Sequence, residues 1–199
     1  MTRPTLYVFD FDGTLTHCDT FPLFAYRVVG RWHWWLTLLR FLPQLAGMKL
    51  HMVDNSRLKE RVMTRLFGGR SEEEMAAHCR ALAETSDTLW RPGAVQLLNR
   101  LTHEGQKVVV VSASLGCWVR PIVHRRYPQA SIIATEHATD EKGQWTGTFR
   151  TPNCYGAEKV KRLKEAFPER DKYHVVAYGD SRGDRQLLAY ADEAHYRTL

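Results

Sequence analysis

Hydrophobic positions follow two different periods along the chain, and together they predict an α/β protein. Short apolar runs rich in valine and isoleucine occupy residues 6–11, 107–114, 131–135 and 173–181, as is typical of buried strands. A three-to-four-residue period predicts helices over 95–104, 118–126, 156–167 and 184–191, and Gly143 and Gly147 indicate a hairpin within 140–149. Strands that alternate with helices predict a parallel sheet covered on both faces, a Rossmann-like core.

Residues 20–90 interrupt this alternation with a helical pattern. Leu58, Val62 and Leu66 form a helical stripe, and Ser71 with Glu74 has the spacing of a capping box at the start of another helix. A helical block between the first and second strands predicts an inserted cap. We therefore expect a catalytic core of residues 1–18 and 92–199, with a helical cap of residues 19–91.

Length and composition are those of an ordinary globular protein. The chain has 199 residues, of which 44% are hydrophobic and 25% are charged. Its cysteines show no zinc-binding spacing, and no secretory signal precedes Leu6, so we expect reduced thiols in a cytoplasmic protein; they are Cys18, Cys79, Cys117 and Cys154.

The positive charge is concentrated in the predicted cap. The formal net charge is +6, and residues 20–70 hold nine Lys or Arg but two acidic residues, Asp54 and Glu60. Such a patch attracts anions: a phosphorylated substrate, an acidic membrane surface or nucleic acid. The alternative is a solubilising face.

A tryptophan-rich segment lies within this basic region. Residues 32–46 contain Trp32, Trp34 and Trp35 followed by several leucines, but His33 and Arg40 among others interrupt the run. It is too short and too polar for a transmembrane helix. It can be the core of the cap, a dimer contact or a segment at a bilayer interface.

The end of the first strand carries the first candidate chemistry. Asp10 and Asp12 lie two positions apart, so a strand period of 2 places both carboxylates on one side, and Gly13 permits a sharp turn. Two neighbouring carboxylates favour a cation between them. A solvated turn is the alternative, and a calcium loop fits poorly because its glycine comes at the sixth position.

Two further strand ends carry polar clusters. Ser112 and Ser114 end the second strand, and Asp180, Ser181 and Asp184 end the last one. In open α/β sheets the binding crevice lies outside the carboxyl ends of the strands, so these clusters predict one site. Lys159, near the start of a helix, adds a cation.

These segments resemble the four ordered motifs of the haloacid dehalogenase superfamily. The segments are DFDGTLT, VVVVSAS, the lysine of GAEK and YGDSRGD, and they extend over most of the chain. An insertion between the first two motifs is similar to the helical cap of the phosphoserine-phosphatase-like branch. The pair of aspartates in DFDGT favours a phosphatase over a dehalogenase.

The resemblance implies a Mg²⁺-dependent phosphatase that works through an aspartyl-phosphate. Asp10 is the implied nucleophile and Asp12 the implied acid and base. An Asp10 oxygen, the Asp12 backbone carbonyl and Asp180 are implied to hold Mg²⁺, with Asp184 in support. The implied phosphate-binding groups are Ser112, the Ala113 amide, Ser114 and Lys159. Taken alone, Ser112 can be a turn hydroxyl, Lys159 a solvated lysine and Asp184 a helix N-cap.

The cap offers two candidate substrate contacts. Asp19 lies where phosphoserine phosphatases carry a glutamate for the substrate amine, and Arg61 lies where they carry an arginine for its carboxylate. Lys59 and Gly183 depart from that pattern and resemble a broader branch that includes a phosphatidylglycerophosphate phosphatase. Both candidates can equally be surface charges.

We therefore expect a small phosphomonoester as substrate, similar to phosphoserine or histidinol phosphate. A lipid phosphate phosphatase at the membrane surface is the first alternative. A non-enzymatic module that binds anions or nucleic acid is the second, although no nucleic-acid partner is expected. The sequence does not define an oligomeric state.

Overall fold

The computed structural model describes residues 3–49 and 54–199, and in these residues five parallel strands form a central sheet. The strand order is β3-β2-β1-β6-β7, with β1 (Thr5–Phe9) in the middle, between β2 (Lys107–Leu115) and β6 (His174–Gly179). The outer strands are β3 (Ser131–Thr135) and β7 (Glu193–Tyr196). The predicted Rossmann-like core is confirmed, while β7 was not predicted.

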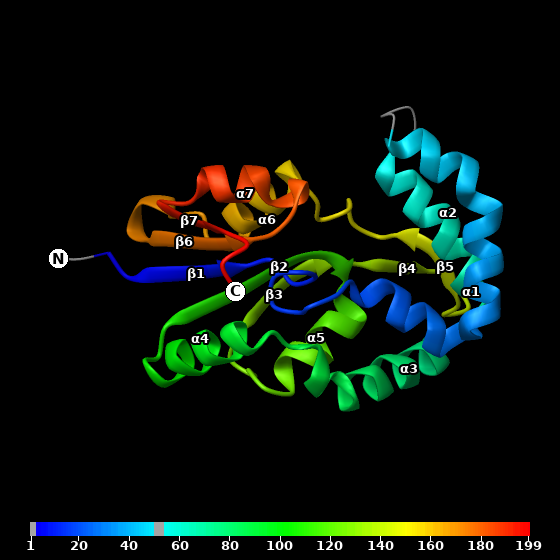
Figure 1. Ribbon diagram of the computed structural model, residues 1–199, viewed down its shortest axis with the longest axis horizontal. Helices are drawn as coiled ribbons and strands as arrows, with labels where there is room; N and C mark the ends of the chain where they lie inside the picture. The colour runs from blue at the N-terminus through cyan, green and yellow to red at the C-terminus, as the bar shows by residue number, and fades with distance from the viewer. Residues whose placement is uncertain (1–2, 50–53) are drawn as a thin grey trace.

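Helices cover both faces of the sheet (Figure 1). One face is covered by α6 (Ala157–Ala166) and α7 (Arg185–Tyr190), the other by α4 (Pro92–His103) and α5 (Gly116–His124). Alternate residues of β1 supply the two cores: Leu6 and Val8 pack toward α6 and α7, while Phe9 packs toward α4 and α5. Every second residue of a strand points to the same face, which explains this division.

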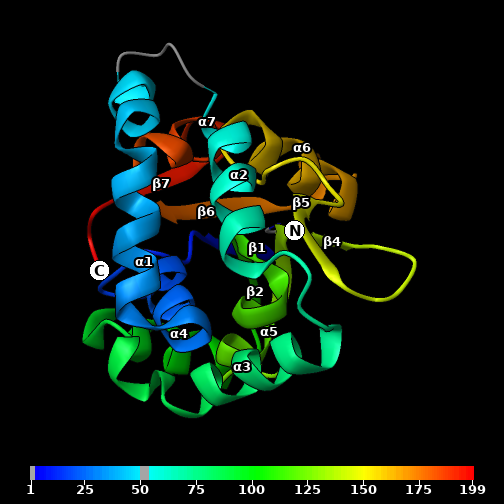
Figure 2. The ribbon, with the colours of Figure 1, turned by 90° about the vertical axis from the view of Figure 1, so that its right-hand side faces the viewer.

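Among the described residues, four α-helices lie between β1 and β2, and three of them fall in the range where the sequence predicts a helical cap. These three are α1 (Thr20–Lys49), α2 (Asn55–Phe67) and α3 (Glu72–Glu84), and a short 3₁₀ helix, η1 (Ser86–Leu89), leads to α4. Figure 2 shows α1 and α2 side by side, with α3 crossing below them. Ser71 caps α3 by accepting the Glu74 N–H at 3.2 Å, while the Glu74 side chain pairs with Arg70 and does not complete a capping box.

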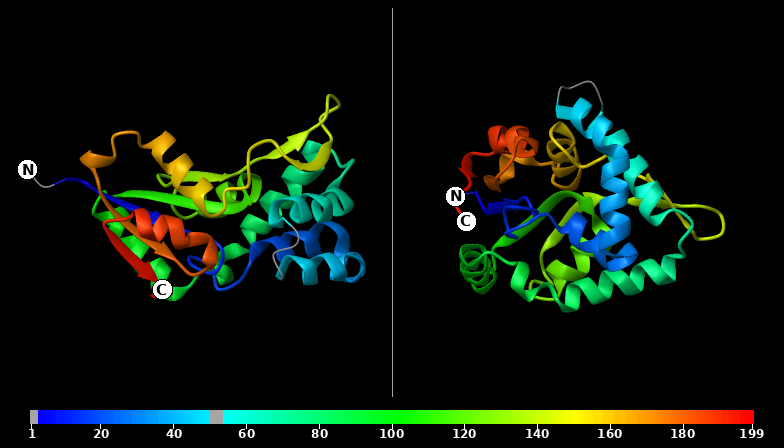
Figure 3. Two further views of the ribbon diagram at one scale, coloured as in Figure 1. Left: turned by 90° about the horizontal axis from the view of Figure 1, so that it is seen from above. Right: turned by 45° about the vertical axis from the view of Figure 1, so that its right-hand side comes forward.

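A β-hairpin packs against the helices that follow β1. The strands β4 (His137–Thr139) and β5 (Trp145–Phe149) pair antiparallel, and β5 packs against α2 (Figure 3). The buried Trp145 ring lies against Phe67 of α2, with ring centroids 6.1 Å apart. The hairpin falls within the predicted core range but contacts the predicted cap. The boundaries of core and cap therefore stay a prediction.

The tryptophan-rich segment divides between core and surface. The backbone of α1 bends at Gly30, where φ is 77° and ψ is 161°, so that residues 31–49 form a separate helical arm. In this arm Trp34 and Phe41 are buried in the cap, whereas Trp32 and Trp35 are exposed. One side of the segment thus packs into the core, the first of the three alternatives, while the other side is exposed. Among the described residues, no helix is long and apolar enough to cross a membrane.

Two short 3₁₀ helices flank β6, namely η2 (Arg170–Lys172) before it and η3 (Arg182–Asp184) after it. The carboxyl ends of β1, β2 and β6 point toward α1 and α2 (Figure 3). All four cysteines lie within the described residues and are free thiols, as expected.

Candidate active site

The polar residues at the carboxyl ends of β1, β2 and β6 meet at one pocket of about 550 Å³. Its walls come from the loop after β1, the end of β2, the start of α6, the loop after β6 and one face of α2. Asp10, Asp12, Asp19, Lys159 and Asp180 all line it. Parallel strands bring their carboxyl ends to one edge, so the expectation that the three clusters form one site is confirmed.

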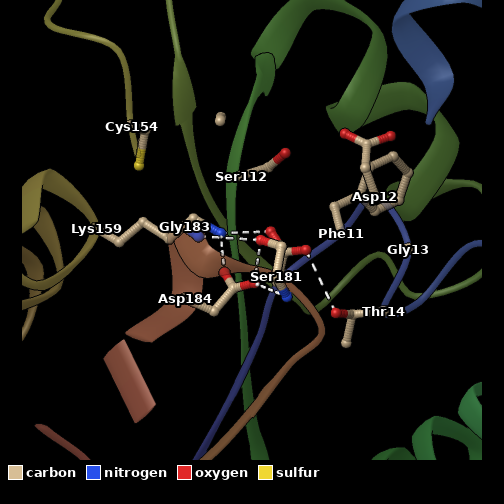
Figure 4. Close-up of polar contacts among 12 residues, drawn as sticks. Phe11, Asp12, Gly13, Thr14, Ser112, Cys154, Lys159, Ser181, Gly183 and Asp184 are labelled. Carbon is tan, nitrogen blue, oxygen red and sulfur yellow. Dashed lines mark hydrogen bonds and ion pairs between the residues drawn. The ribbon is translucent and has the colours of Figure 1, made fainter. Parts of the chain in front are cut away.

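Asp10 lies at the bottom of this pocket and is held by a buried lysine. Lys159 Nζ contacts Asp10 Oδ1 and donates to Asp184 Oδ1 at 2.6 Å. Only 2% of Lys159 and none of Asp184 is exposed, which excludes a solvated lysine. Figure 4 shows Lys159 and Asp184 pointing toward one another, with Ser181 beside Asp184.

Asp184 supports the loop after β6 rather than capping α7. Its Oδ2 accepts hydrogen bonds from the Ser181 N–H at 3.0 Å and the Ser181 hydroxyl at 2.8 Å, and from the Asp180 N–H at 3.3 Å. The Asp184 side chain makes no capping hydrogen bond to α7. With Oδ1 on Lys159 and Oδ2 on this loop, Asp184 positions its neighbours.

Thr14 joins the first and last clusters. Its hydroxyl lies 3.3 Å from Asp10 Oδ2 and 3.2 Å from Asp180 Oδ1. Thr14 is part of the DFDGTLT segment, but nothing in the sequence pattern alone indicates this bridging role. Next to it, Gly13 has a φ of 81°, and a Cβ there would lie 2.5 Å from Asp180 Oδ2. Only glycine fits both this backbone conformation and this close approach.

Asp12 is held in the pocket by donors from other elements. Ser114 Oγ donates to Asp12 Oδ2 at 2.5 Å, and the N–H and hydroxyl of Thr20 donate to Oδ1 at 2.7 and 2.6 Å. Each carboxylate oxygen of Asp12 therefore accepts at least one hydrogen bond, which fixes the orientation of this side chain in the pocket. This arrangement fits the role implied by the family resemblance.

Burial and crowding raise the pKa values of Asp10 and Asp12. Burial raises the pKa of Asp10 to about 7, with Asp184 and Asp12 adding to the rise and Lys159 opposing it. Burial also raises the pKa of Asp12, and the nearby Asp19 adds to it. Asp184 differs: burial acts to raise its pKa, but Lys159 and Ser181 outweigh burial and lower it.

The acidic cluster fits a divalent cation. Among the described residues, Asp10, Asp180 and Asp184 can each offer an oxygen within 4.8 Å of the others. With Lys159 as their cation, the three ionised carboxylates leave two net negative charges. Burial, followed by the charge of Asp184, raises the pKa of Asp180, and the Thr14 hydroxyl, Arg197 and Lys159 oppose this rise. Hard oxygen ligands of this kind suit Mg²⁺.

The hydroxyl cluster at the carboxyl end of β2 lies beside this centre. Ser112 is buried and its Oγ accepts the Ser114 N–H at 3.0 Å, while Ala113 and Ser114 line the pocket. The Ala113 carbonyl accepts from Lys59 at 2.8 Å and from Thr135 at 3.0 Å. Their implied role in binding phosphate stays a prediction.

The placement of Arg61 corrects the sequence analysis. Arg61 is exposed and lines a separate surface groove with Phe41 and Thr148, outside the Asp10 pocket. Asn55, Leu58, Lys59 and Val62 are the α2 residues that line the pocket. Two positions along a helix turn a side chain to nearly the opposite face, so Lys59 and Arg61 cannot both face the site.

Lys59 is the functional candidate that the sequence analysis missed. It was noted there only as a departure from a family pattern. Burial lowers its pKa, while the charges of Asp19 and Asp12 act in the opposite direction. Its ammonium lies 5.9 Å from the centroid of the Phe21 ring. The helical spacing of Asn55, Leu58, Lys59 and Val62 is the sequence signal that could have found it.

A parallel sheet with acidic strand ends, an insertion after the first strand and a buried helix lysine defines a class of hydrolases. A sequence model of the haloacid dehalogenase-like hydrolases matches residues 7–189, and the chain belongs to this family. The resemblance stated from the sequence is confirmed.

Several known proteins are similar to this chain in sequence or in fold. Protein CicA of Caulobacter vibrioides is 35% identical over 199 residues, which cover 98% of this chain and 86% of CicA. A Bordetella pertussis protein of unknown function has a similar structure, with a TM-score of 0.74 and 20% identity over 94% of this chain and 87% of that one. A substrate-bound phosphoserine phosphatase has a TM-score of 0.67 and 16% identity over 98% and 87% of the two chains.

Proposed function

We propose that this protein is a Mg²⁺-dependent phosphatase that hydrolyses a small phosphomonoester through an aspartyl-phosphate on Asp10. The observation that carries the proposal is the position of Asp10. Its carboxylate lies in a pocket, between the Lys159 ammonium and the Thr14 hydroxyl and beside a second carboxyl group, Asp12. An anion-binding module has no use for buried carboxylates at this point, since they repel its ligand.

In the first step, an Asp10 oxygen attacks phosphorus and forms the aspartyl-phosphate, while the bond to the leaving oxygen breaks. Lys159 offsets the charge of Asp10 and Asp184 throughout. Bound Mg²⁺, held by Asp10, Asp180 and the Asp12 carbonyl, would neutralise phosphate charge that otherwise repels the nucleophile.

Asp12 handles the protons in both steps. Its raised pKa favours the protonated form that donates to the leaving alkoxide. In the second step Asp12 takes a proton from water as the water attacks the aspartyl-phosphate. This releases inorganic phosphate and restores both carboxyl groups. Ser114 and Thr20 keep the Asp12 side chain oriented for both transfers.

The pocket also contains one basic and one acidic side chain, Lys59 and Asp19, which suits a substrate whose leaving group carries charges of both signs. Lys59 and Asp19 line the same pocket as Asp10, and Lys59 supplies the cation that the sequence analysis sought in Arg61. Asp19 suits an amine, and Lys59 suits a carboxylate or another anion. A phosphorylated amino acid such as phosphoserine fits this pair, and histidinol phosphate fits its Asp19 side.

A lipid phosphate is the alternative substrate, favoured by the exposed tryptophans of the cap. One panel separates these possibilities: p-nitrophenyl phosphate, phosphoserine, histidinol phosphate and phosphatidylglycerophosphate, each with Mg²⁺ and with EDTA. The proposal expects Mg²⁺-dependent hydrolysis and the highest kcat/KM for one of the amine-bearing esters. A higher kcat/KM for phosphatidylglycerophosphate would make a lipid phosphate the substrate in place of a small metabolite. If none of the four compounds is hydrolysed, the substrate assignment is wrong.

A further inference from the structure

A face of α1 exposes apolar side chains that the proposed reaction does not use. Beyond Gly30 this helix has two apolar faces, of which one is buried in the cap through Trp34, Phe41 and the neighbouring Thr37. The opposite face has exposed fractions between 52% and 83%; it consists of Trp32, Trp35, Leu36, Leu39 and Leu42, which we call the outer strip.

The spacing of the outer strip makes it continuous. Its residues follow one another by three, one, three and three positions, which places them along one side of a helix. Figure 1 shows this part of α1 at the edge of the molecule, with α2 beside it. A solvated helix face is normally polar, and a contiguous exposed apolar patch marks an interaction site.

Basic side chains border the outer strip. A groove of about 520 Å³ between α1 and α2 is lined by Leu36 of the strip and by His33, Arg40, Arg65 and Arg70. Arg70 pairs with Glu74, whereas Arg40 and Arg65 are exposed at the groove. Residues 20–70 as a whole carry nine basic and two acidic side chains. Apolar and cationic groups thus share one surface.

We propose that the outer strip and this basic groove form a docking surface for an anionic lipid bilayer. Tryptophan and leucine insert at the boundary between headgroups and acyl chains, while arginine binds lipid phosphates. A second copy of the chain is a poorer occupant, because a two-fold contact would bring two strongly positive segments together. Charge complementarity therefore favours an anionic surface.

The docking surface is separate from the reaction proposed above. No residue of the outer strip lines the Asp10 pocket in the described part of the chain. The inference therefore holds or fails on binding alone, whether or not the protein hydrolyses a phosphate ester.

Cosedimentation with vesicles tests the proposal. We expect the protein to bind vesicles of equal parts phosphatidylglycerol and phosphatidylcholine, to bind pure phosphatidylcholine vesicles at least tenfold more weakly, and to be released as salt is raised. The double variant Trp32→Ser/Trp35→Ser should bind the anionic vesicles at least tenfold more weakly. Its matched control is Tyr196→Ser on β7, an aromatic side chain that is 52% exposed, which should bind like the parent.

A second pair of variants isolates the charges. Each cation near an anionic surface contributes roughly fivefold in affinity, so Arg40→Gln/Arg65→Gln should bind roughly 25-fold more weakly. The control Lys161→Gln/Lys172→Gln removes two cations on α6 and η2, away from the docking surface, whose side chains are 62% and 67% exposed. It should change binding little. Circular dichroism confirms that each variant is folded.

Three results would overturn the proposal. The first is a parent protein that does not bind the anionic vesicles. The second is equal loss of binding in the cap variants and their controls. The third is a dimer in analytical ultracentrifugation that becomes a monomer in Trp32→Ser/Trp35→Ser, since a second copy would then occupy the outer strip.

Discussion

Lys159 donates a 2.6 Å hydrogen bond to Asp184, and the same ammonium contacts Asp10. All three side chains are buried. Burial acts to lower the pKa of Lys159, but the two carboxylates outweigh burial and raise it, so the lysine stays charged. One buried cation thus fixes the proposed nucleophile and the residue that supports the neighbouring loop.

Replacing Lys159 with Met should destabilise the protein and abolish its turnover. The variant leaves two buried carboxylates without their cation, a loss of about 3–5 kcal/mol in the free energy of unfolding at neutral pH. Lys161→Met, an exposed change on the same helix, is the matched control and should cost little. Urea unfolding of both variants measures the difference.

The cost of Lys159→Met should shrink in acid. Lys159 helps to hold the pKa of Asp184 below its ordinary value of 3.8, so the stabilisation is present above that value. The stabilisation is lost as the pH falls below 3.8, because Asp184 then becomes protonated in the parent protein and no longer forms an ion pair with Lys159. An equal cost across the acid range would contradict this assignment of the ion pair.

Ser114→Ala should move the basic limb of the pH–rate profile to higher pH. The Ser114 hydroxyl bonds the Asp12 carboxylate and lowers a pKa that burial has raised. Without this bond, Asp12 keeps its proton to higher pH and still serves as the general acid. The profile of kcat against pH checks the shift, and a shift toward lower pH would show that Asp12 is not the acid.

Lys59→Met should impair substrate selection, while Arg61→Met should not. The two residues lie two positions apart on α2, but Lys59 lines the Asp10 pocket and Arg61 does not. Loss of one charge-assisted contact costs about 1.5–3 kcal/mol, roughly tenfold to a hundredfold in kcat/KM for a substrate with an anionic leaving group.

p-Nitrophenyl phosphate, whose leaving group lacks that second charge, is the control substrate for this pair and should change little. If Arg61→Met showed the larger loss for the charged substrate, the assignment of Lys59 would be wrong.

Mg²⁺ should bind more tightly as the pH rises through neutrality. Burial raises the pKa of Asp10 to about 7, so a cation must displace its proton in mildly acidic solution. We expect roughly a tenfold gain in affinity from about pH 6 to about pH 8. Calorimetry measures the Mg²⁺ affinity of the parent and of Asp180→Asn at the two pH values. The variant should bind Mg²⁺ more weakly than the parent at both. Equal affinity at both would contradict the role of Asp10 as a ligand.

Much of the site could be predicted because its residues lie at fixed points of a parallel sheet. Asp10, Ser112 and Asp180 follow apolar runs that read clearly as buried strands, and the sheet brings strand ends together. β7 was missed because Glu193–Tyr196 lacks an apolar run and joins the sheet through backbone pairing with β6.

The cap was harder to predict, because the rotation of a helix about its axis depends on what it packs against. The stripe of Leu58, Val62 and Leu66 was identified, but the open site at the edge of that stripe was not. Lys59 lies there, half-buried, and its ammonium donates to the Ala113 carbonyl. A family pattern pointed instead to Arg61, on the opposite side of the same helix.

The central claim is that Asp10 is the nucleophile of a Mg²⁺-dependent phosphatase. The most direct test is the hydrolysis of p-nitrophenyl phosphate by the parent and by Asp10→Asn, with Mg²⁺ and with EDTA. We predict turnover by the parent that EDTA abolishes, and no measurable turnover by the Asp10→Asn protein, which remains folded by circular dichroism. Turnover by Asp10→Asn at even a tenth of the parent rate, or a parent that hydrolyses nothing, would contradict the account.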